Sequence, residues 1–182
     1  MGCSSLYNDS RIIIENDIVK SSRRIRKEYY YNRPIERRTN LNFVKQTILK
    51  EISDSSGISY TFFDVLSLTS DAYNPEDKVF LIIDNEIIPI SVQLNESIMI
   101  DEIKKEEGSI LTSDSTEMTV ITGYTPLHNK IIKLRYSVPP DIMNKIVSCT
   151  ILQFRYYSGP HKITIKLKGN RLKKLKKIVL FE

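Results

Sequence analysis

Residues 78–93 contain two apolar, β-branched segments that flank a polar turn at Asp84 and Asn85. Two such segments joined by residues that tolerate a positive φ are typical of a β-hairpin. Pro89 lies within the second segment and cannot donate a hydrogen bond to a neighbouring strand. We therefore predict a hairpin whose second strand lies at a sheet edge or carries a bulge.

Other segments also alternate between apolar and polar side chains. In residues 130–136, Ile132 and Leu134 fall on one face and Lys133 on the other, as in a sheet with one solvated face. The same pattern predicts strands over residues 41–52, 58–68, 117–124, 151–157 and 163–168. Residues 123–129 are expected to connect two of these strands. The segment 41–52 also fits a helix, but its Asn and Thr residues favour a strand.

Two segments have helical spacing instead. Pro139, Pro140 and Asp141 suit the first turn of a helix, and an apolar stripe follows them. Near the C-terminus, Asn170 is a candidate N-cap for a basic helix with Leu172 on its apolar face. We expect short helices near residues 139–147 and 170–180.

Many short strands separated by polar turns predict a mainly β fold. We expect a β-sandwich, immunoglobulin-like or of a related two-sheet type. Residues 41–182 are predicted to form this single domain, with the basic helix at its C-terminus. Residues 1–40 are predicted to be a lipid-anchor region and a basic tether, because a segment so polar and charged cannot bury much of itself.

The net charge of +5 is unevenly distributed along the chain. Residues 39–166 carry 12 basic and 16 acidic side chains, so the excess of positive charge lies before and after them. Such segregation could serve an anionic partner, or it could only solubilise the flanking segments. The candidate contacts with an anionic partner are Arg23, Arg24, Arg37, Arg38, Lys173, Lys174 and Lys177. No base-stacking aromatic arrangement accompanies them, so nucleic acid is not favoured.

The most specific short motif is Gly2-Cys3-Ser4-Ser5. It looks like the junction at which a bacterial lipoprotein is cleaved and acylated, which would make Cys3 the lipidated residue. Two alternatives remain open. N-myristoylation of Gly2 also begins with Met-Gly-Cys, but that pattern calls for Ser or Thr where this chain has Leu6. The motif can also be a coincidence.

No recognised catalytic spacing occurs in the sequence. The two histidines, His128 and His161, both fall in predicted turns and lack the spacing of zinc ligands. No Gly-x-Ser-x-Gly elbow and no glycine-rich phosphate loop is present. Cys149 precedes an apolar strand, where a buried, inert thiol is expected. We predict no catalytic residues, no metal site and no cofactor.

Three segments carry a resemblance to a family: residues 77–86 (DKVFLIIDNE), 154–160 (FRYYSGP) and 163–177 (ITIKLKGNRLKKLKK). They resemble small uncharacterised cell-envelope lipoproteins of anaerobic Gram-negative bacteria. The resemblance implies a compartment and no chemistry. We therefore expect a non-catalytic binding or scaffolding module, held at a membrane of the cell envelope by lipid on Cys3, with another envelope protein as a candidate partner. The alternative is a basic module that binds nucleic acid or a membrane surface. The sequence specifies no small-molecule ligand.

Overall fold

The computed structural model describes residues 11–32, 34–36, 39–111 and 117–181. Its elements, in chain order, are β1 (Ile13–Asp17), β2 (Ser22–Tyr31), β3 (Leu41–Ser53), β4 (Gly57–Thr69), β5 (Lys78–Ile83), β6 (Glu86–Ser91), β7 (Leu94–Leu111), β8 (Glu117–Ser137), α1 (Pro140–Ser148), β9 (Leu152–Ser158), β10 (His161–Leu167) and α2 (Gly169–Leu180).

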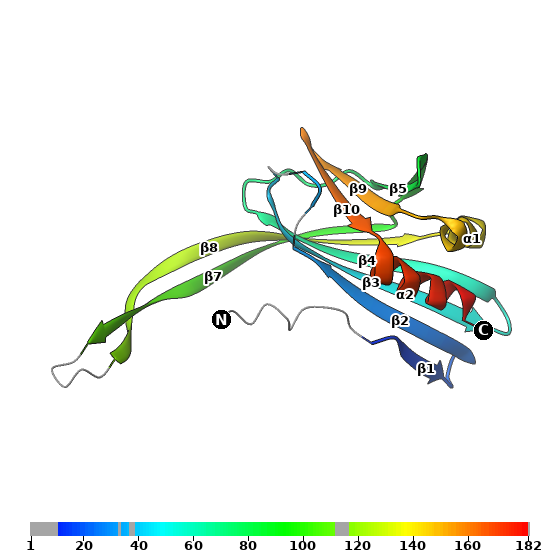
Figure 1. Ribbon diagram of the computed structural model, residues 1–182, viewed down its shortest axis with the longest axis horizontal. Helices are drawn as coiled ribbons and strands as arrows, with labels where there is room; N and C mark the ends of the chain where they lie inside the picture. Colours follow the sequence, from blue (N-terminus) through cyan, green and yellow to red (C-terminus); the bar gives the residue numbers. More distant parts are fainter. Residues whose placement is uncertain (1–10, 33, 37–38, 112–116, 182) are drawn as a thin grey trace.

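The strands form two antiparallel sheets (Figure 1). One has six strands in the order β1-β2-β3-β4-β8-β7, and the other has four in the order β10-β9-β5-β6. Both helices lie near the positions expected from the sequence. The predicted fold class, mainly β with two sheets packed as a β-sandwich, is confirmed.

The core lies between the two sheets because each strand turns alternate side chains inward. The six-stranded sheet contributes buried residues such as Ile48, Phe62 and Tyr136, and the four-stranded sheet contributes Leu81 and Phe154. The ring of Phe62 packs on both aromatic neighbours, with centroids 5.4 Å from Tyr136 and 5.7 Å from Phe154. The contact between Phe62 and Phe154 crosses from one sheet to the other and joins them into one domain.

Helix α2 lies over β2 and β3, beside the four-stranded sheet (Figure 1). The hydroxyl of Tyr29 donates to the carbonyl of Arg171 over 3.2 Å, near the start of the helix. At its end, the ammonium of Lys50 donates to the carbonyl oxygens of Val179, over 2.7 Å, and Phe181. A cation at this position satisfies the unpaired carbonyls and complements the helix dipole. The predicted cap at Asn170 is wrong: the helix begins at Gly169 without a side-chain cap.

The hairpin predicted over residues 78–93 is confirmed as β5 and β6, which pair up to Ile83 opposite Glu86. Asp84 in its turn has a positive φ of 52°. Its carboxylate accepts hydrogen bonds from both backbone and side chain of Thr150 and from the backbone of Ile151. Strand β6 is an edge strand, as Pro89 predicted.

The expected tether is wrong for much of residues 1–40. β1 pairs with β2, and β2 pairs with β3 along its full length. Ile25, Tyr29 and Tyr31 of β2 are buried in the core. The folded domain therefore begins well before residue 41, because alternate side chains of this basic segment face inward and most of them are apolar. Lys27, between Ile25 and Tyr29, is buried on the same face.

The separation of residues 117–124 and 130–136 into two strands is also wrong. β8 runs without interruption from Glu117 to Ser137, and β7 pairs with it over a similar length. The two strands continue beyond the body of the molecule as a long ribbon (Figure 1).

Candidate functional site

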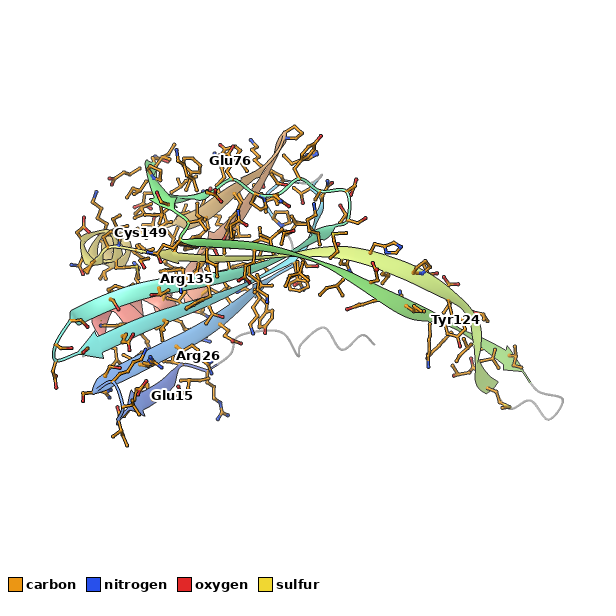
Figure 2. The ribbon with its side chains drawn as sticks, turned by 180° about the vertical axis from the view of Figure 1, so that it is seen from behind. Glu15, Arg26, Glu76, Tyr124, Arg135 and Cys149 are labelled. Atoms are coloured by element: carbon orange, nitrogen blue, oxygen red, sulfur yellow. The ribbon has the colours of Figure 1, made fainter. Side chains whose placement is uncertain are left out.

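The most exposed element is the outer part of the β7–β8 hairpin, residues 101–111 and 117–128, which we call the arm. β8 pairs with β4 only from Asn129 to Ser137, so its earlier residues pair with β7 alone. At about 3.4 Å per residue the arm extends roughly 35 Å from the sheet. Figure 2 shows Tyr124 on the arm, well away from Arg26 and Cys149 in the body.

The arm carries large apolar side chains that remain exposed among the described residues. Ile103 has 73% of its surface exposed and Tyr124 62%. Others that are exposed on the arm are Ile110, Met118, Ile121 and Leu127. Single exposed apolar residues are ordinary, but a series on one projecting element is typical of an interaction surface.

Polar contacts across the arm hold its two strands in register. Asp101 Oδ1 and His128 Nδ1 lie 2.7 Å apart, and the hydroxyl of Thr125 donates to the carboxylate of Glu106. Thr122 donates to the backbone carbonyl of Glu106 over 3.2 Å, beside an irregularity in the pairing at Glu106 and Glu107. These contacts stabilise the ribbon itself and tie it to nothing else.

The arm has unpaired backbone groups along both of its edges, because each strand has only one neighbour. An isolated two-stranded ribbon is only marginally stable in water. Its described residues include five carboxylates against two lysines, a net charge of −3. Because the whole chain carries +5, the arm is acidic and the rest is basic.

A buried polar cluster lies between the sheets, centred on Asp64. The hydroxyls of Tyr136 and Tyr156 each donate to Asp64 Oδ2 over 2.7 Å, and the amide of Gln46 donates to Tyr136 over 3.4 Å. Burial raises the pKa of Asp64 to about 6, although the hydrogen bonds to it act in the opposite direction. Within the described residues, Asp64 Oδ1 accepts no hydrogen bond of normal length and angle. The cluster joins β4, β8 and β9. Sequence reasoning missed it although Asp64 shares the inward face of β4 with Phe62 and Leu66, because a carboxylate is not expected among buried apolar side chains.

The hollows on the described surface differ in the groups that line them. One of about 460 Å³ is lined by Tyr30, Asn32, Asn42 and Phe43, which provide neither a carboxylate nor an imidazole. Another, of about 330 Å³, has Glu15, Glu28, Arg24 and Arg26 in its lining. Within the described residues, no group of three His, Cys, Asp or Glu could hold a metal ion. Cys149 is buried, as predicted, and burial raises the pKa of its thiol.

The predicted site residues are only partly brought together. Lys173 and Lys177 are exposed on α2 and Lys174 is half-buried beside them. The guanidinium of Arg23 lies 4.8 Å from the ring centroid of Phe181, at the C-terminal end of the same helix.

Arg24 lies on the opposite face of β2. It forms ion pairs with Asp17 at 3.0 Å and with Glu51 at 3.1 Å. Cys3, Arg37 and Arg38 lie outside the described residues. Of the described members of the N-terminal basic cluster, Arg23 lies beside α2 and Arg24 does not.

These features define a β-sandwich-like protein whose distinctive element is a projecting ribbon. No protein-family model matches the chain, and neither a curated protein nor a solved structure matches it significantly. None of the helices in the described residues has both the length and the apolar character to cross a bilayer.

Proposed function

We propose that the chain is a binding or scaffolding module without catalytic activity, and that the arm is its partner-binding element. The observation that carries this proposal is the exposure of apolar side chains along a ribbon whose two edges are unpaired. A partner strand would complete the backbone hydrogen bonds, and the partner's side chains would cover the apolar residues.

The proposal includes attachment to a membrane of the cell envelope through lipid on Cys3. It is supported by the motif Gly2-Cys3-Ser4-Ser5 and by the resemblance to envelope lipoproteins. In this arrangement the lipid fixes the domain at the membrane and the arm reaches another envelope protein. Mass spectrometry of the protein from its native cells tests the attachment: a diacylglyceryl group on Cys3 is expected, and an unmodified Cys3 would contradict it.

Photo-cross-linking tests the role of the arm. A photoreactive amino acid is placed at Ile103 on the arm or, as a matched control, at Ile87 on β6, whose exposed fractions are 73% and 61%. Irradiation of native cells should give a discrete adduct from position 103 and none from position 87. Adducts from position 87 alone, or from neither position, would refute the proposal.

The alternative function, binding of an anionic partner, is supported by one observation. α2 has no acidic residue in its first turn, and Lys173 and Lys177 are exposed one helical turn apart. The test is co-sedimentation with vesicles containing anionic lipid. Under this alternative, the double variant Lys173→Ala and Lys177→Ala should lose binding, whereas Lys104→Ala and Lys105→Ala on the arm should not. Equal losses from both pairs, or no binding at all, would contradict it.

A further inference from the structure

β7 is the least protected strand edge in the described part of the chain. The edge strand β1 has only five residues, and β6 contains Pro89. The edge of β10 is covered at Thr164, which bonds to the backbone of Ile35 and the carboxylate of Glu36. β7 has 18 residues and no proline. Long regular edges of this kind are templates for another strand.

The other edge of the arm is blunted. β8 carries Pro126, which cannot donate a hydrogen bond, and Gly123, which lies beside the irregularity opposite Glu106 and Glu107. Both features disfavour the addition of a strand. A partner strand is therefore expected on the β7 side of the arm.

The charge sequence of β7 is self-complementary. Lys104 and Lys105 are followed directly by Glu106 and Glu107. When this strand runs antiparallel to its own copy, the two lysines of one chain approach the two glutamates of the other. Opposite charges facing each other across strands stabilise the pairing, and like charges oppose it.

We propose that β7 pairs with β7 of a second copy, antiparallel, about a two-fold axis at Lys105. This inference rests on the proposed function, for which it names the partner. Four arm strands would then form one continuous sheet, which exceeds the minimum for independent stability. Each acidic arm tip would point toward the basic body of the other copy.

Side-chain direction selects the register. Residues directly opposite each other in antiparallel strands point to the same face, so the axis must pass through a residue of β7. An axis at Lys105 places Lys104 opposite Glu106 of the second copy and Ile100 opposite Ile110. The two Lys105 side chains then meet at the axis, each diagonal to a Glu107, which long side chains can reach. An axis at Glu106 also pairs Lys105 with Glu107, but it places two acidic residues, Asp101 and Glu102, opposite the apolar Leu111 and Ile110. The axis at Lys105 places only one, Glu107, opposite an apolar residue, Ile103. The first register is the better match.

Charge-exchange variants of the full chain test this pairing by analytical ultracentrifugation. The acidic variant carries Lys104→Glu and Lys105→Glu, and the basic variant carries Glu106→Lys and Glu107→Lys. Each alone should raise the dimer Kd by roughly tenfold or more, because two attractive pairs become repulsive. An equimolar mixture should dimerise again. The fourfold exchange, which contains all four changes, should dimerise like the native chain and controls for lost contacts within the arm.

Cysteine cross-linking tests the register in a Cys3→Ser background. Lys105→Cys should give a covalent dimer under mild oxidation, since residues at the axis lie within disulfide range. Glu106→Cys should not, because its two copies would be offset along the strands. A chain that stays monomeric at all concentrations, or equal cross-linking by both variants, would overturn the inference. A monomer that still forms Ile103 adducts with another protein would overturn self-pairing and leave the proposed function standing.

Discussion

At the scale of single residues, the buried carboxyl of Asp64 is the centre of the polar cluster between the sheets. Two tyrosine hydroxyls donate to one of its oxygens, and the other accepts no hydrogen bond among the described residues. Burial raises the pKa of this carboxyl from 3.8 to about 6. The folded state therefore binds the proton more tightly than the unfolded chain does.

The raised pKa predicts a loss of stability as the pH rises. Between about pH 4 and pH 6 the folded state holds a proton that the unfolded chain has released, so the free energy of unfolding falls across this window and then levels off. A shift of roughly two units corresponds to about 3 kcal/mol. The side chain introduced by Asp64→Asn cannot ionise, so the free energy of unfolding of this variant, measured in urea, should not fall across this window. Between about pH 4 and pH 7 the variant should therefore gain about 3 kcal/mol of stability relative to the native chain. Parallel stability curves for the two proteins would contradict the prediction.

Lys50 and Lys45 lie on opposite faces of β3 and provide a second test at this scale. Lys50→Met should lower the free energy of unfolding by about 2–3 kcal/mol, because the last carbonyls of α2 lose a charged, buried donor. Lys45→Met removes an exposed-face ion pair with Glu28 and should cost less than about 1 kcal/mol. Equal losses in urea unfolding would show that Lys50 does not hold the helix.

At the scale of elements, the arm is structurally separable from the body. None of its side chains belongs to the hydrophobic core. Replacing residues 101–128 by Asn-Gly would join Ile100 to Asn129, which already face each other across the ribbon. Urea unfolding should remain cooperative, with a change below about 1 kcal/mol, as for surface changes remote from the core. Loss of cooperative unfolding would mean that the arm supports the body.

The elements that the sequence predicted are those in which apolar and polar side chains follow a regular local pattern. The β5–β6 hairpin was predictable because Asp84 and Asn85 sit between two apolar runs, and the C-terminal part of β8 because Leu134 is buried while Lys133 is exposed. β2 was missed because its basic residues mask the alternation of Ile25, Tyr29 and Tyr31. The arm was predicted only in part: residues 117–124 were expected to be a strand, but residues 123–129 were expected to be a connection, and the charged residues 101–107 did not indicate a partner strand. The candidate site therefore depends on how far two consecutive strands continue to pair beyond the sheet, which the sequence alone does not display.

At the scale of the whole molecule, the N-terminal segment is part of the domain. Ile25 and Tyr29 of β2 are almost fully buried, and β2 carries contacts to β3 and α2. Deleting residues 1–40 should therefore abolish cooperative thermal unfolding, measured by circular dichroism, because an entire core-facing strand is removed. A truncated chain that melts like the native protein would restore the tether interpretation.

The arrangement of the whole molecule determines where it can bind a partner. The body is closed by two sheets and α2, whereas β7 offers an open strand edge along the arm. Self-pairing through β7 would place two bodies at opposite ends of a shared four-stranded ribbon. With lipid on both copies of Cys3, such a dimer would have two attachments to one membrane, which strengthens anchoring through avidity.

Hydrogen–deuterium exchange in the full chain tests the self-pairing of β7 most directly. The amides of residues 101–111 that point away from β8 should exchange slowly in concentrated protein and faster on dilution, because the partner strand covers the open edge of β7. Outward-facing amides of residues 117–128 should exchange quickly at both concentrations. Rapid exchange of the outward-facing amides of residues 101–111 at every concentration would show that β7 has no partner strand and would contradict self-pairing of the arm.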